Sequence, residues 1–204
     1  MPQKTLCNST HAANPNKPTD DVAATQPGCA FAQITLGGGC HWCTEAVFQS
    51  LSGVIKVEQG FARSTSPYDS WSEAVRVSFD PEKISEEQLV RVHLHTHAAT
   101  KAHSMRGKYR SALYFRNHNH SNNHNQQQRL AEILTVLGNE FPEPLITQIL
   151  PLEGFKTSPP QYQNYYQTDP ERPFCQLYIA PKLEKVQRLV NNSAEKINLS
   201  EHDK

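Results

Sequence analysis

Three consecutive glycines, Gly37 to Gly39, constrain the fold of this chain more than any other segment, because they separate two patterns of different period. Before them, Phe31–Leu36 alternates like a strand. After them, residues recur at every fourth position as on one face of a helix: Cys43, Val47 and Leu51. Gly53 then stands where a helix ends. The sequence therefore predicts a strand, a glycine turn and a helix that begins near Cys40.

The rest of the chain continues this alternation of strands and helices. Further strands are expected at Val54–Phe61, Glu73–Phe79, Tyr109–Phe115 and Leu145–Leu150. Further helices are expected at Ser85–His97, which opens on a capping box, at Asn125–Leu137 and at Pro181–Ala194. Because the two kinds of element are interleaved, the sequence predicts an α/β fold, an α+β sandwich in which helices flank a mixed β-sheet.

The length of 204 residues suits one domain with extensions rather than two domains. Residues 1–30 contain almost no large apolar side chains, so burial cannot offset their loss of chain entropy, and we expect a disordered extension. The folded domain is expected at residues 31–195. Residues 196–204 are expected to form a polar C-terminal tail.

Composition excludes several classes of partner. Lys plus Arg equals Asp plus Glu at 20 each, so no net field attracts nucleic acid or an acidic membrane surface. No apolar run approaches the ~20 residues of a membrane helix, and the N-terminus lacks the basic and apolar segments of a secretory signal. The sequence therefore predicts a soluble cytoplasmic protein, which we expect to be a monomer.

Cysteine usage indicates thiol chemistry rather than a disulfide framework. The five cysteines, an odd number without regular spacing, are Cys7, Cys29, Cys40, Cys43 and Cys175. Cys40 stands at the expected helix N-terminus, where free backbone N–H groups and the helix dipole stabilise a thiolate. Cys43 lies on the same side of the first turn and can form a redox pair with it. The alternative is that each cysteine is a small buried core residue.

Four segments of the chain carry a resemblance to a known family. They are Gly37–Gln49, Ser72–Lys83, Lys108–Tyr114 and Pro173–Lys182. Together, across roughly residues 31 to 190, they resemble the peptide methionine sulfoxide reductase A family. The resemblance implies reduction of the S epimer of methionine sulfoxide, free or in oxidised proteins, through a Cys40 sulfenic acid and an intramolecular disulfide. It also implies that no cofactor is bound and that thioredoxin, or dithiothreitol in the test tube, restores the enzyme.

Glu73 is the expected proton donor to the sulfoxide oxygen. Strand alternation places it on the same face as three apolar residues, Val75, Val77 and Phe79. An apolar setting raises the pKa of a carboxyl group and keeps it protonated near neutral pH. The resemblance implies the same role for the matching glutamate. The alternative is a carboxylate that reaches water from the end of its strand.

The resemblance also implies a set of substrate-binding residues. Tyr109 matches a tyrosine that hydrogen-bonds the sulfoxide oxygen, although its strand pattern alone predicts a core residue. His41 replaces the family's usual phenylalanine beside the nucleophile, and Trp42 is implied as a wall for the substrate methyl group. Further candidates lie in loops that differ from the family pattern, namely Tyr68, His103, which stands near a missing aspartate, and Tyr162.

Two cysteines are candidates to resolve the Cys40 sulfenic acid. Cys43 is expected to attack first, because its i,i+3 position holds the two sulfurs near each other. Cys175 is expected to accept the bond afterwards by exchange. Alternatively, Cys175 packs as an apolar residue beside Leu177 and Ile179 on a strand-like face.

Two functions of other classes compete with this interpretation. The first is a thioredoxin-like disulfide exchanger, because a Cys-x-x-Cys pair at a helix start is typical of that class too. The second is a zinc-binding module, in which Cys40 and Cys43 are joined by histidines from the set His93, His95, His97 and His103. A helical pattern scatters the first three histidines around its axis, which argues against zinc.

Overall fold

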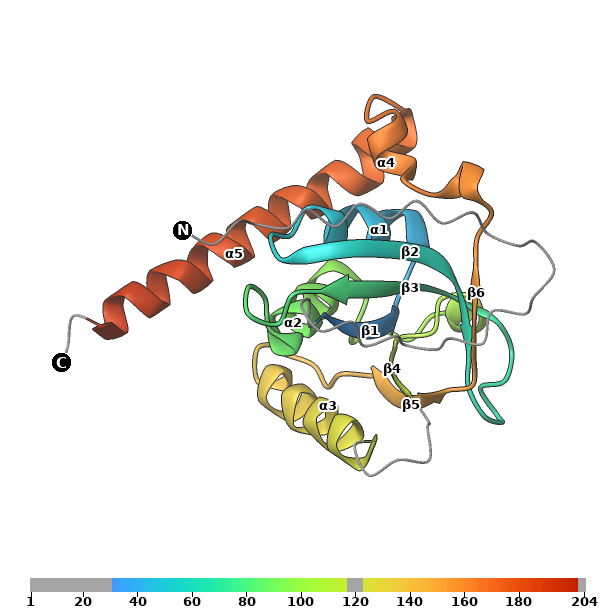
Figure 1. Ribbon diagram of the computed structural model, residues 1–204, viewed down its shortest axis with the longest axis horizontal. Coiled ribbons are helices and arrows are strands. Elements are labelled where there is room, and N and C mark those ends of the chain that lie inside the picture. Colours follow the sequence, from blue (N-terminus) through green and yellow to red (C-terminus); the bar gives the residue numbers. More distant parts are fainter. Residues whose placement is uncertain (1–30, 117–122, 202–204) are drawn as a thin grey trace, which may run out of the picture.

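The computed structural model describes residues 31–116 and 123–201. In these residues six strands form one sheet in the order β5-β4-β1-β3-β2-β6 (Figure 1). The strands are β1 Ala32–Gly37, β2 Val54–Arg63, β3 Ser72–Phe79, β4 Ala112–Arg116, β5 Gln148–Leu152 and β6 Gly154–Thr157. Strands β4 and β5 pair in parallel and the other neighbours pair antiparallel, so the sheet is mixed, which confirms the predicted fold class.

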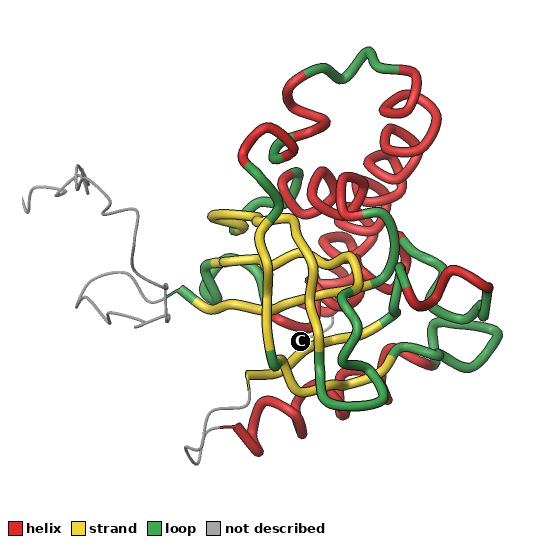
Figure 2. The backbone as a smooth tube through the Cα atoms, turned by 90° about the vertical axis from the view of Figure 1, so that its right-hand side faces the viewer, coloured by secondary structure: helices red, strands yellow, loops and turns green. Residues whose placement is uncertain are grey.

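Helices lie above and below the strands in Figure 2. The α-helices are α1 His41–Gln49, α2 Glu86–Thr96, α3 Asn123–Gly138, α4 Tyr165–Thr168 and α5 Ala180–Glu201. Shorter turns are the 3-10 helices η1 Ser104–Gly107 and η2 Pro160–Tyr162, and the π-helical turn η3 Cys175–Ile179 leads directly into α5. None of the described helices combines the length and the apolar character needed to span a membrane.

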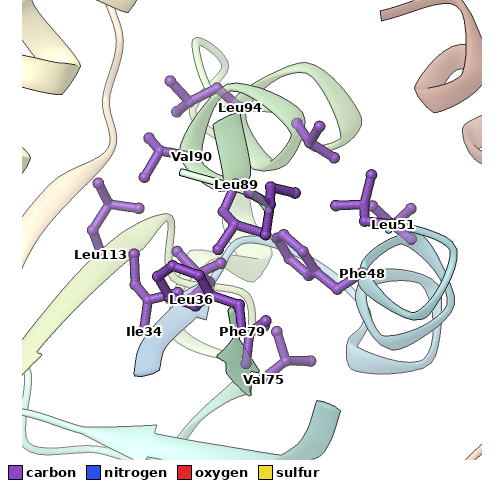
Figure 3. Close-up of a cluster of buried hydrophobic side chains, with 14 of the residues drawn as sticks. Ile34, Leu36, Phe48, Leu51, Val75, Phe79, Leu89, Val90, Leu94 and Leu113 are labelled. Atoms are coloured by element: carbon purple, nitrogen blue, oxygen red, sulfur yellow. The ribbon is translucent and has the colours of Figure 1, made fainter. Parts of the chain in front are cut away.

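The main core lies between one face of the sheet and the helices α1 and α2. Strand β3 contributes Val75 and Phe79 to it, α1 contributes Phe48, and α2 contributes Leu89 (Figure 3). Burial of each such side chain stabilises the fold by about 1.5–3 kcal/mol. The opposite face of the sheet carries a smaller cluster: Ala62, Ala74, Ala112, Tyr114 and Leu150. Because side chains alternate along β3, Glu73 belongs to the face that α1 covers.

The predicted strand, glycine turn and helix are all present. The turn needs glycine, because a Cβ at Gly37 would lie 2.8 Å from the Arg110 carbonyl oxygen, and Gly39 has a φ of +152°. The capping box of α2 is confirmed as well. The Ser85 hydroxyl accepts the Gln88 N–H, and the Gln88 side chain accepts the Ser85 N–H.

The secondary structure differs from the sequence prediction in several details. Strand β4 begins at Ala112 rather than Tyr109, because the Tyr109 N–H donates to Met105 O and closes a local turn. The short edge strand β6 was not expected. Helix α5 continues to Glu201, beyond the expected end near Ala194. The extension expected at 1–30 lies outside the described residues, and so do Cys7 and Cys29.

Candidate active site

Cys40 is the residue that immediately precedes α1, where backbone N–H groups are free to bind a thiolate. The pKa of Cys40 is lowered from 9.0 to about 7, and the largest cause is a hydrogen bond from the Cys43 side chain. Backbone N–H groups of Cys43 and Trp42 act in the same direction, whereas burial and the charge of Glu73 oppose it. Near neutral pH, much of Cys40 is therefore a thiolate, the form that acts as a nucleophile.

Cys43 is affected in the opposite direction. Its thiol is buried, and its pKa is raised, first by the hydrogen bond that it gives to Cys40 and then by burial. All three described cysteines are free thiols. Cys40 is therefore the first of the pair to ionise, and Cys43 remains protonated beside it.

A cavity of about 260 Å³ opens beside these two thiols. Its lining comes from four parts of the chain: the glycine turn, α1, the end of α2 with the bend before β4, and the C-terminal segment. Side chains that meet there include Cys40, Cys43, His97, Tyr109, Phe174 and Lys182. Cys40 thus faces a space that is lined by neutral polar groups, aromatic rings and one lysine.

Glu73 lies close to the same helix N-terminus. Its carboxylate accepts the His41 backbone N–H at 3.0 Å, and its other oxygen lies 3.4 Å from Lys108 Nζ. The residue is buried on the face of β3 that carries Val75, as the sequence predicts. The surroundings are not wholly apolar, however, because Lys108 and the His41 N–H both reach the carboxylate.

His41 does not line the cavity as a substitute for the family's phenylalanine. Its Nδ1 lies 3.0 Å from the Gly60 carbonyl oxygen, so Nδ1 carries the proton, and its ring meets Phe61 edge-on at 5.3 Å. Nε2 lies 3.9 Å from the Glu73 carboxylate. The backbone N–H of His41 therefore holds the Glu73 carboxylate, and the His41 ring does not form a wall of the cavity.

Tyr109 is half-buried and shares the cavity with Cys40. Its backbone is fixed in the bend, because its carbonyl oxygen accepts from Arg106 Nη1 at 3.1 Å. Lys108 Nζ lies 5.0 Å from the centre of the Tyr109 ring and also pairs with Glu73. The hydrogen bond to Tyr109 and the charge of Glu73 raise the pKa of Lys108. Lys108, which sequence reasoning did not single out, thus links the two proposed donors.

Trp42 packs into an aromatic group at the outer side of α1. Its ring stacks on Tyr165 at 4.2 Å and meets Phe174 edge-on at 5.8 Å. The buried Glu45 carboxylate accepts the backbone N–H groups of Asn164 and Tyr165, at 2.7 and 3.1 Å, and so fixes Tyr165. Phe174 in turn lines the cavity. Trp42 therefore supports the wall of the cavity through Phe174.

Like His41 and Trp42, the three other predicted substrate-binding residues do not line this cavity. Tyr68 packs against the cluster on the opposite face of the sheet, where the Arg110 guanidinium lies 5.3 Å from its ring. His103 is exposed in the loop before η1. Tyr162 is 49% exposed in η2, and its carbonyl oxygen accepts from Gln59. These three side chains therefore lie outside the cavity that contains Cys40.

Cys175 is distant from Cys43 in the sequence but packs against it in the fold. It is fully buried in a cluster with Cys43, Ala46 and Ile179, and burial raises its pKa. The expected strand-like face is wrong, because Cys175 begins a helical turn. Leu177, expected to pack beside it, is 65% exposed, since residues two apart in a helix point in different directions.

The histidines of the zinc alternative are used in other ways. His97 Nδ1 donates to the His93 carbonyl oxygen at 2.6 Å, and its Nε2 lies 2.7 Å from the Ser111 hydroxyl. Burial lowers the pKa of His97 and lowers that of His93 to about 4. His95 pairs with Glu140 at 2.8 Å. In the described parts of the chain, no three His, Cys, Asp or Glu side chains are grouped as metal ligands.

Comparison with known proteins identifies the family. The family model described as peptide methionine sulfoxide reductase matches residues 32–195. Peptide methionine sulfoxide reductase MsrA of Deinococcus radiodurans is 37% identical, over 80% of this chain and 84% of that protein. The namesake from Trichodesmium erythraeum is 33% identical, over 76% and 93%.

The fold agrees with these relatives. The solved structure of methionine sulfoxide reductase A of Corynebacterium diphtheriae superposes with a TM-score of 0.59 and 26% identity, over 72% of this chain and 77% of that one. Mxr1 from Saccharomyces cerevisiae in its reduced form superposes with a TM-score of 0.57 at 22% identity, over 69% and 87% of the two chains. The chain therefore belongs to the peptide methionine sulfoxide reductase family.

Proposed function

We propose that this chain reduces the S epimer of methionine sulfoxide, free or in oxidised proteins, with Cys40 as its nucleophile. The observation that carries the proposal is the Cys40–Cys43 pair at the start of α1. There, the Cys40 thiol, whose pKa is lowered to about 7, shares a cavity with Cys43 and Tyr109. Family membership supports the same activity.

The first step joins Cys40 to the sulfur of the substrate. The Cys40 thiolate attacks the sulfoxide sulfur while the sulfoxide oxygen takes up one proton from a positioned donor, for which Glu73 and Tyr109 are the candidates. The hydroxyl group then passes to the Cys40 sulfur as the substrate S–O bond and the bond between the two sulfurs break, so methionine leaves and Cys40 is a sulfenic acid. The sulfoxide sulfur is thereby reduced by two electrons.

The second step reduces the sulfenic acid. Cys43 attacks the Cys40 sulfur, the S–O bond breaks, and the oxygen leaves as water, which creates a Cys40–Cys43 disulfide. Cys175, packed against Cys43, then attacks the Cys43 sulfur, which releases the Cys40 thiol and leaves a Cys43–Cys175 disulfide. We propose thioredoxin as the dithiol that reduces this disulfide, with dithiothreitol as its substitute in the test tube.

The remaining expectations are part of the same proposal. The catalytic domain spans residues 31–195, and the protein acts as a cytoplasmic monomer without a bound cofactor. The rings of Trp42 and Phe174, which meet edge-on at 5.8 Å, support an apolar binding surface for the substrate methyl group.

The test uses a peptide with each epimer of methionine sulfoxide and an excess of dithiothreitol, followed by mass measurement. We expect the S epimer to lose one oxygen and the R epimer to remain unchanged. Conversion of neither epimer, or of the R epimer alone, would contradict the proposal. Reduction of insulin disulfides without sulfoxide reduction would instead favour the disulfide exchanger.

A further inference from the structure

Lys182 brings a positive charge into the Cys40 cavity from the far end of the chain. It is the third residue of α5, and its half-buried side chain lines the cavity together with Cys40 and Cys43. Its Nζ donates to the carbonyl oxygen of Thr96, the last residue of α2. This contact lies at the negative end of the α2 dipole, which favours a cation there.

The other groups that line the cavity in the described part of the chain do not supply a permanent charge. Tyr109 and Tyr178 are phenols, and His97 is kept neutral because burial lowers its pKa. Burial lowers the pKa of Lys182 itself, whereas the charges of Cys43 and Cys40 raise it and that of Lys185 lowers it. The charged form of Lys182 is therefore stabilised most when Cys40 or Cys43 is ionised.

The thiol that must be ionised changes during the proposed reaction, from Cys40 in the first step to Cys43 in the second. Before the first step, the Cys43 S–H donates to Cys40, and this bond raises the pKa of Cys43. Once Cys40 is a sulfenic acid, the negative charge on Cys40 is gone, and Cys43 must itself lose a proton to attack. Lys182 acts on Cys43 in the required direction, because its charge lowers the pKa of that thiol. Cys175, the other thiol that faces Cys43, opposes ionisation when it is charged.

We propose that Lys182 is a positioning residue for the second step, whose ammonium holds Cys43 as the thiolate that attacks the Cys40 sulfenic acid. The inference rests on the proposed function and adds to it. In this step the Cys43 electron pair forms the S–S bond and the S–O bond of Cys40 breaks. The departing hydroxide combines with the proton that Cys43 lost, which gives water. Lys182 is neither oxidised nor reduced.

The test separates the two steps in a single turnover. Wild type, Lys182→Met and Lys182→Arg are mixed with one equivalent of S-sulfoxide peptide, and samples are quenched over time. Methionine reports the first step, and loss of the dimedone-reactive Cys40 sulfenic acid reports the second. Lys185→Met is the matched control, because Lys185 is an exposed lysine on the same helix.

In Lys182→Met we expect disulfide formation to be about 10-fold slower at pH 7, since one unit of pKa changes the thiolate fraction tenfold. We expect methionine formation to slow less, because Lys182 also faces the charge of Cys40 but Cys40 has other groups that stabilise its thiolate. The sulfenic acid then accumulates, and the pH midpoint of disulfide formation moves upward. High pH restores the wild-type rate, which a misfolded variant cannot show. Lys182→Arg and Lys185→Met are expected to match wild type.

A disulfide rate that is unchanged in Lys182→Met, or reduced equally at every pH, would overturn the proposal. So would a parallel loss of both steps. The second step can also be started with hydrogen peroxide, which oxidises the Cys40 thiolate to a sulfenic acid without any sulfoxide. Failure of wild type to produce methionine contradicts the proposed function, whereas the peroxide experiment judges Lys182 on its own.

Discussion

Cys40 and Cys43 share a hydrogen bond across the first turn of α1, and this bond shifts their pKa values in opposite directions. The Cys40 thiol becomes more acidic, and the Cys43 thiol, which donates the hydrogen bond, becomes less acidic. We infer that this contact suits the two thiols to the different roles proposed for them, because Cys40 ionises first and Cys43 stays protonated until Cys40 has reacted.

The Cys43 donor should control the ionisation of Cys40. Cys40 is protonated and inert below its pKa and reactive above it, so its alkylation by iodoacetamide should rise with pH with a midpoint near 7. Cys43→Ala removes the donor and should move this midpoint upward. Cys43→Ser keeps a hydroxyl donor and should leave it close to wild type. Peptide mass after alkylation at several pH values measures both, and an identical midpoint in Cys43→Ala would show that the hydrogen bond is unimportant.

Glu73→Gln should slow methionine formation by about 10²-fold, because positioned proton transfer typically contributes on that order. The amide preserves the shape of a buried side chain and can still accept the His41 N–H. The measurement is the rate with excess dithiothreitol, with exposed Glu82→Gln as the matched control. An unchanged rate in Glu73→Gln would leave this carboxyl with a structural role only.

The local part of the site was predictable from the sequence. The glycine turn, the helix after it and the i,i+3 spacing of the two cysteines depend on neighbouring residues, and each is present. Lys182 could not be found in this way, because its place beside Cys43 depends on the packing of α5 against α1 and α2. The role of Tyr68 was inferred from the family, but its ring packs near Arg110 on the opposite face of the sheet, a contact between distant residues that the sequence pattern does not show.

The contacts of the three cysteines predict the order of disulfide exchange. Cys43 forms a hydrogen bond with Cys40, whereas Cys175 packs against Cys43. Cys43→Ser should therefore block disulfide formation with Cys40. Cys175→Ser should still form the Cys40–Cys43 disulfide but turn over slowly with thioredoxin. Disulfides are mapped by peptide mass after one equivalent of substrate. Normal turnover of Cys43→Ser, with Cys175→Ser stalled before any disulfide forms, would make Cys175 the direct resolver.

The proposed mechanism requires that Cys40 is the residue that reduces the sulfoxide. A variant that combines Cys43→Ser with Cys175→Ser keeps Cys40 as the last cysteine of the described residues and removes its resolving partners. With excess S-sulfoxide peptide and no reductant, it should release one methionine per protein and carry one dimedone adduct, on Cys40. Adding Cys40→Ser to this variant should abolish both signals while the melting temperature stays similar. Methionine release that persists without Cys40, or that occurs without a Cys40 adduct, would contradict the mechanism.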